Sequence, residues 1–181
     1  MAMFERKIIS LNIAMKSVKF PKRYVPASLS KKDENKQLRM LLKSKKMYKK
    51  GNYFTRKRLP SFQNKPSKHL SNARKIYKIE SVKPNAELAR KTGCKLSALN
   101  EIVKRGEGAY YSSGSRPNQT PKSWGLARLA SSLTGGKAAA IDYDILSRGC
   151  QHNKTAFRLA GKSRRKYDTG HTKAIKRSFK I

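Results

Sequence analysis

The stretch that decides the fold is GEGAYYSSGSRPNQTPKSWGLARLASSLTGG, residues 106–136. Its first half is dense in glycine, serine and tyrosine, a composition typical of a turn-rich loop. Thr120 then offers a side-chain cap, and Pro121 suits the first position of a helix. The stretch therefore predicts a loop that leads into a capped helix ended by Gly135-Gly136. Apolar residues at i, i+3, i+4 and i+7 give this helix one apolar face: Leu126, Leu129, Ala130 and Leu133.

Further helices are predicted on both sides of this stretch. Asn85 is a favourable cap for a helix through Lys91, Gly93 breaks that helix, and residues 96–104 are expected to form a second one. Downstream, Ile and Tyr alternate over residues 138–145, which favours a strand. Residues 154–160 are expected to form one more short helix.

The flanking regions are basic. Ser30 can cap an amphipathic helix over residues 31–49, and Pro66 begins another helix. Residues 4–20 fit either a helix or a strand. The segment from Gly161 onward is polar and basic, so we expect it to be disordered unless a partner orders it.

The sequence thus predicts a mainly α protein, with α+β as the open alternative. We expect a small compact helical domain with a minor strand element and long basic, partly extended arms. The expected parts are an extended or amphipathic N-terminal arm (1–29), a basic helical region (30–78), a compact signature domain (79–160) and a basic C-terminal tail (161–181).

The charge of the chain indicates its partners. Its 181 residues contain 44 Lys and Arg against 10 Asp and Glu, a formal net charge of +34. Residues 1–78 carry +20 and residues 151–181 carry +9, whereas residues 79–150 carry +5. Self-repulsion of this size favours a polyanionic partner, such as nucleic acid, an anionic membrane surface or acidic proteins in an assembly.

Two cysteines, Cys94 and Cys150, lie far apart in the sequence. They form neither a disulfide framework nor a paired zinc motif, which suits a reducing compartment, and a single bridge between them stays open. No apolar run approaches the ~20 residues of a membrane span. We expect no signal peptide at the N-terminus.

The signature loop suggests an anion site. Hydroxyls, backbone N–H groups and an arginine beside a helix N-terminus can hold a phosphate. The alternative is that the serines satisfy their own loop while the tyrosines fill the core. The candidate anion- or phosphate-binding residues are Ser112, Ser113, Ser115 and Arg116.

A second set of candidates concerns nucleic acid. The helices around Gly93 have the spacing of a helix-turn-helix, although any helical hairpin in a small domain requires the same pattern. Tyrosines can also stack on bases. The nucleic-acid-binding candidates are Lys95, Ser97, Asn100, Lys104, Tyr110 and Tyr111.

Catalysis is not expected. Cys150 and His152 are two residues apart, a spacing that does not bring side chains together on a helix, and no third orienting group is evident. Asp142 and Asp144 are interpreted as partners of internal salt bridges rather than as metal ligands. No cofactor motif is present, so neither a cofactor nor a metal is expected.

Three motifs carry a family resemblance: Gly108–Pro117 (GAYYSSGSRP), Ser123-Trp124 and Gly135-Gly136. They resemble the signature of an uncharacterised domain family of nucleocytoplasmic large DNA viruses and some tailed phages. The resemblance covers roughly residues 85–150 closely and the upstream Lys/Tyr-rich region more loosely. It implies a viral source and no particular activity.

Resemblance and charge together lead to a functional expectation. We expect a non-enzymatic structural protein of the virion, an internal or minor capsid component of a large DNA virus. Its basic arms would bridge other capsid proteins to an anionic inner membrane or to viral DNA. It would lie inside the capsid shell, and in the host cytoplasm during assembly. The alternative is a DNA-binding, genome-packaging protein that uses the helix-turn-helix-like segment.

Overall fold

The computed structural model describes residues 17–170 and 174–180. The described chain is mainly helical with one small antiparallel sheet, which confirms the predicted fold class. Part of the predicted N-terminal arm, residues 1–16, lies outside the described residues. The elements, in chain order, are β1 (Ser17–Pro21), α1 (Lys31–Tyr48), α2 (Lys68–Tyr77), α3 (Ala86–Thr92), α4 (Leu96–Ser112), α5 (Pro121–Leu133), α6 (Lys137–Ile141), α7 (Tyr143–Gly149), α8 (Thr155–Tyr167) and β2 (Lys176–Lys180).

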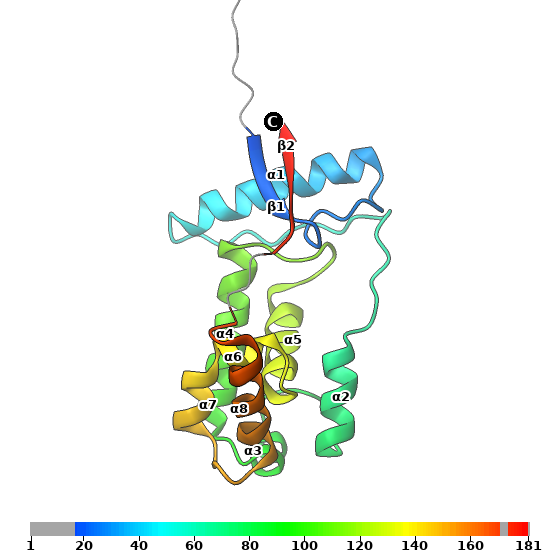
Figure 1. Ribbon diagram of the computed structural model, residues 1–181. Coiled ribbons are helices and arrows are strands. Elements are labelled where there is room, and N and C mark those ends of the chain that lie inside the picture. Colours follow the sequence, from blue (N-terminus) through cyan, green and yellow to red (C-terminus); the bar gives the residue numbers. More distant parts are fainter. Residues whose placement is uncertain (1–16, 171–173, 181) are drawn as a thin grey trace, which may run out of the picture.

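Seven helices, α2 to α8, form a body around one apolar core (Figure 1). Its centre is the long contact between α4 and α5, where two glycines meet. A side chain at Gly106 would lie 2.6 Å from the Cα atom of Gly125, so the two helices approach each other at backbone distance. Leu99, Ile102 and Leu129 are fully buried beside this crossing.

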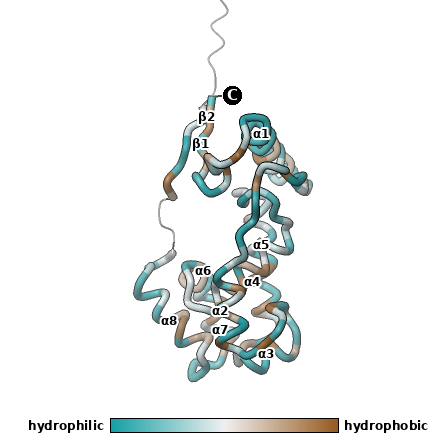
Figure 2. Tube along the Cα trace, turned by 90° about the vertical axis from the view of Figure 1, so that its right-hand side faces the viewer, coloured by the Kyte–Doolittle hydropathy of each residue, from teal (hydrophilic) through white to brown (hydrophobic). Residues whose placement is uncertain are grey.

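The remaining elements, β1, α1 and β2, form a cap over one end of this body. Figure 2 shows the cap apart from the body. β1 and β2 pair in antiparallel register, with Ser17 opposite Lys180 and Val18 opposite Phe179. Phe20, Leu41 and Leu59 are buried in the second apolar core that this sheet shares with α1. Residues of the two predicted arms therefore pack against each other.

The local helix signals are confirmed. Ser30 accepts a hydrogen bond from the Asp33 N–H at the start of α1, within the predicted 31–49 helix. α5 begins at Pro121, and Thr120 forms a reciprocal capping box with Ser123. Both helices were predicted from residues adjacent to their own ends, where capping energies are local.

Three predictions were wrong. The first part of the signature stretch is helix rather than loop, since α4 continues to Ser112. Gly106 lies inside this helix because the close crossing with α5 leaves no room for a side chain there. Residues 138–145 form parts of α6 and α7 instead of a strand, since consecutive alanines favour helix. The segment from Gly161 is largely ordered, as α8 extends to Tyr167 and β2 pairs with β1.

Candidate functional site

The cap and the body are joined through one buried cation, Arg56, in the extended segment after α1. Its guanidinium donates hydrogen bonds to Ser44 Oγ (3.1 Å), the Tyr110 carbonyl (3.1 Å) and Ser115 Oγ (2.7 Å). It also lies 3.6 Å from the centre of the Tyr110 ring, and its backbone N–H donates to the Tyr110 hydroxyl. Burial lowers the pKa of Arg56, and the neighbouring tyrosines oppose this effect. Arg56 thus ties α1, its own segment and the end of α4 together.

The hydrogen bond from Arg56 to Ser115 bears directly on the predicted anion site. Ser115 is fully buried, and its hydroxyl accepts from Arg56 and donates to the Arg116 carbonyl. Ser112 lies at the end of α4, and its hydroxyl is 3.4 Å from that of Ser113. Ser113 and Arg116 are exposed. The four candidates therefore do not converge on one open site, because Ser115 already serves the internal junction.

Asn118 is a second junction residue that the sequence analysis missed. Its amide accepts from the Leu59 N–H (2.7 Å) and donates to the carbonyls of Leu59 (3.0 Å) and Phe62 (2.9 Å). Its φ of 57° lies in the left-handed region, which asparagine tolerates better than most residues. Asn118 thereby fastens the segment after α1 to the loop before α5.

The two adjacent tyrosines of the signature have opposite environments. Tyr110 is fully buried under Arg56, which is incompatible with its predicted role in stacking on a base. Tyr111 lies outward and packs with Tyr48 at the end of α1 and Tyr53 in the extended segment. Tyr48 is 36% exposed and Tyr53 is 67% exposed. These three rings, which we call the tyrosine cluster, form an accessible aromatic surface.

The other nucleic-acid candidates lie on the outer side of α4. Ser97, Asn100, Lys104 and Tyr111 are spaced three, four and seven residues apart, so they share one face of this helix. Ser97, Asn100 and Lys104 are exposed, whereas Leu99 and Ile102 on the opposite face are buried. Lys95 is exposed at the N-cap of α4, after the turn at Gly93 that follows α3. The structure therefore brings five of the six candidates to the surface of one helix.

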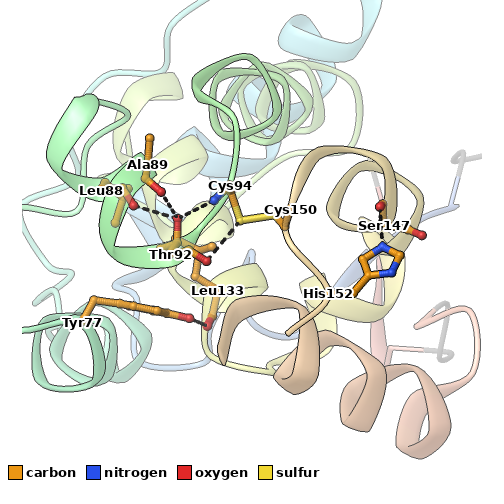
Figure 3. The surroundings of a disulfide bond; sticks show 9 residues. All are labelled: Tyr77, Leu88, Ala89, Thr92, Cys94, Leu133, Ser147, Cys150 and His152. Atoms are coloured by element: carbon orange, nitrogen blue, oxygen red, sulfur yellow. Dashed lines mark hydrogen bonds between the residues drawn. A yellow bond between two sulfur atoms is a disulfide. The ribbon is translucent and has the colours of Figure 1, made fainter. Parts of the chain in front are cut away.

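Cys150 offers no free thiol to the neighbouring His152. Cys94 and Cys150 are joined by a disulfide, and their backbones form a β-bridge (Figure 3). His152 stacks on the Phe157 ring, and its Nε2 atom is 2.9 Å from the Ser147 carbonyl (Figure 3 shows the latter contact). The sequence alone did not decide whether the two cysteines are bridged, and the structure shows that they are.

Asp142 and Asp144 form internal ion pairs, as interpreted from the sequence. Asp142 is fully buried, with its carboxylate 2.6 and 2.9 Å from the Arg128 guanidinium. Asp144 pairs with Arg105 and Arg148, and the hydrogen bond from Arg105 is the main cause that lowers its pKa. In the described residues no cluster of three or more His, Cys, Asp or Glu is arranged to hold a metal ion.

α1 separates its charges between two faces. Asp33 and Glu34 are buried toward the rest of the cap, where Asp33 accepts from the Ser61 hydroxyl and Glu34 pairs with Arg177. The opposite face presents exposed cations at alternating spacings of four and three residues, so they follow one line along the helix. Many α1 residues are hydrophilic (Figure 2). This cationic stripe consists of Lys32, Lys36, Arg39, Lys43 and Lys46.

The site therefore defines a class of protein: a highly basic helical protein with an exposed cationic stripe and an aromatic surface. Residues 21–173 match a family of unknown function, DUF5824, and the chain belongs to this family. No curated protein and no solved structure matches the chain. Among the described residues, no helix has the length and apolar character needed to cross a membrane.

Proposed function

We propose that this protein is a non-enzymatic structural component of a large DNA virus particle, an internal or minor capsid protein. Its basic surface joins other capsid proteins to an anionic partner, either the inner membrane or the viral genome. The viral source rests on the resemblance of the signature stretch. The mode of attachment rests on the distribution of charge.

The observation that carries the proposal is the cationic stripe of α1. From Lys32 to Lys46 it covers fifteen residues, and the rise between its two ends is about 21 Å of helix. Both carboxylates of the same helix, Asp33 and Glu34, are buried away from the stripe, so they do not interrupt it, although Asp33 offsets part of the charge of Lys32 and Lys36. A line of cations without interleaved acids binds regularly charged surfaces and carries no means of reading a sequence.

The alternative is a DNA-binding, genome-packaging protein, and one observation favours it. Ser97, Asn100 and Lys104 share the exposed face of α4 beyond the turn at Gly93, where a helix-turn-helix presents its reading helix. Glu101 lies beside them and pairs with Arg105 and Arg148. Its negative charge weighs against close approach of phosphates to this face.

The first experiment locates the protein in fractionated particles. Nuclease-treated empty shells and released genome cores are compared by quantitative mass spectrometry. Retention with the shell, at fixed stoichiometry to the major capsid protein and in moderate salt, is expected for a capsid component. Departure with the genome contradicts the proposal and favours the packaging alternative.

A charge experiment tests the stripe itself. The variant Lys36→Gln/Arg39→Gln/Lys43→Gln removes three charges from α1. Arg158→Gln/Lys162→Gln/Arg165→Gln removes three exposed charges from α8 as the matched control.

For duplex DNA, the slope of log affinity against log salt should become shallower by about 2–3 in the α1 variant. Binding to vesicles with 30% phosphatidylserine should weaken as well. Equal losses in the α8 variant would show that net charge, and not the stripe, governs attachment.

A further inference from the structure

We propose that the tyrosine cluster is a binding site for single-stranded nucleic acid, with bases stacked on Tyr48, Tyr53 and Tyr111. This inference goes beyond the proposed function, because it concerns a site on the isolated protein and is independent of its place in a particle. The cluster lies where the end of α1 meets the end of α4.

The geometry of the rings suits stacking. Their centres are 4.8 Å apart for Tyr53 and Tyr111, 6.1 Å for Tyr48 and Tyr53, and 6.4 Å for Tyr48 and Tyr111. The rings of Tyr48 and Tyr111 are nearly parallel, with an angle of 6° between their planes. Tyr53 is two-thirds exposed, so most of its aromatic surface is left for a ligand.

The cluster is held rigidly from below. The buried Tyr110 ring meets Tyr111 edge to face at 5.1 Å. Arg56, three residues after Tyr53, lies 3.6 Å from the centre of the Tyr110 ring. Ser44 donates a hydrogen bond to the Tyr111 carbonyl, which fixes the two helices at this point. A preorganised surface loses little conformational entropy when a base stacks on it.

The surroundings have the charge that a phosphate backbone requires. Lys49 and Lys50 follow Tyr48 directly, and both are exposed. Lys104 lies on the same face of α4 as Tyr111, two turns away, with the half-buried Glu107 between them. Between Glu34 and Glu80 the chain contains no acidic residue. Aromatic rings set among cations are the combination by which proteins bind single strands without sequence preference.

A single strand fits this site better than a duplex. The faces of duplex bases are already stacked on one another, so rings on a protein surface reach only unpaired bases. The phosphates of either form can contact the lysines. The tyrosines therefore supply a preference for unpaired bases that the lysines alone would not give.

The test compares two ligands of equal charge. Fluorescence anisotropy measures binding of the full chain to a labelled 20-nucleotide oligothymidine and to an abasic oligonucleotide of the same length. Tyr53→Ala should weaken oligothymidine binding about five- to a hundred-fold, because one stacked base is lost. It should leave abasic binding unchanged. Tyr53→Phe keeps the ring and should restore oligothymidine binding.

Tyr167→Ala on α8 is the matched control, since it removes a tyrosine distant in the chain from the cluster. Thermal melting of each variant checks folding. The proposal is overturned if Tyr53→Ala binds oligothymidine as the wild type does, or if both ligands weaken equally. It is also overturned if the variant loses binding only to phosphatidylserine vesicles. None of these results depends on where the protein lies in a particle.

Discussion

Replacement of Arg56 by methionine is the sharpest test of how the cap is joined to the body. Methionine retains much of the side-chain length but removes the charge and every side-chain donor. Three acceptors lose the hydrogen bond that they accept from Arg56: Ser44 Oγ, the Tyr110 carbonyl and Ser115 Oγ. The contact of the guanidinium with the Tyr110 ring is lost as well.

The expected loss follows from burial. Arg56 is 9% exposed and Ser115 is fully buried, so water cannot easily replace the missing donors. Each buried acceptor left without its donor costs about 1–3 kcal/mol. The costs do not add fully, because the three acceptors share one cation and the two hydroxyls keep the bonds that they donate. We expect the free energy of unfolding to fall by about 3–5 kcal/mol. For a chain of this size that corresponds to a decrease in Tm of about 6–20 °C.

Thermal and urea unfolding, followed by circular dichroism, measure the change. Arg56→Lys should give a smaller loss, because one ammonium keeps the charge but lacks the planar set of donors. Arg58→Met is the control: this residue is exposed two positions away, and its change should stay within about 0.5 kcal/mol. An Arg56→Met protein that melts within about 2 °C of the wild type would refute this account of the junction.

Three further predictions concern packing, pH and redox state. Gly125→Ala places a methyl group 2.8 Å from an α4 carbonyl and should cost about 1–3 kcal/mol in urea unfolding, whereas Gly161→Ala, with nothing closer than 3.8 Å, should be neutral or stabilising. Hydrogen bonds from a serine hydroxyl and a backbone N–H lower the pKa of Asp33. Its contribution to stability is therefore complete above the ordinary pKa of 3.8 and is lost as the pH falls through the lowered value. The Tm of an Asp33→Asn protein should therefore fall less steeply with decreasing pH in the acid range than that of the wild type. The disulfide closes a loop with a separation of 56 residues, so Cys94→Ser/Cys150→Ser should lose about 4 kcal/mol, and its Tm should no longer respond to reductant.

The parts of the fold that could be predicted are those whose causes are local. The capping residue Thr120, Pro121 and the leucine spacing specify α5 within one short window. The extension of α4 through Gly106 could not be predicted in the same way, since it depends on the contact with Gly125 on another helix. The pairing of β1 with β2 joins segments about 160 residues apart and leaves no local pattern.

The candidate site shows the same limit. The outward face of α4 follows from helical spacing once Ser97, Asn100 and Lys104 are known to be in one helix. Arg56 could not be distinguished in the sequence from many neighbouring cations, because only its burial under α1 and α4 makes it different. The tyrosine cluster likewise combines rings from three segments, of which only Tyr111 was singled out.

The pairing of Ser17 with Lys180 has a consequence for the order of folding. During synthesis, α2 to α8 are complete before β2 exists, so the body can form before the sheet of the cap is paired. Contacts this distant in sequence carry the largest loop-closure entropy and form late. A ribosome-bound chain therefore leaves Val18 and Phe20 without their partner strand until β2 emerges. Chaperones that recognise apolar segments should thus bind nascent chains, or chains cut before β2, and release the protein once β2 has paired with β1.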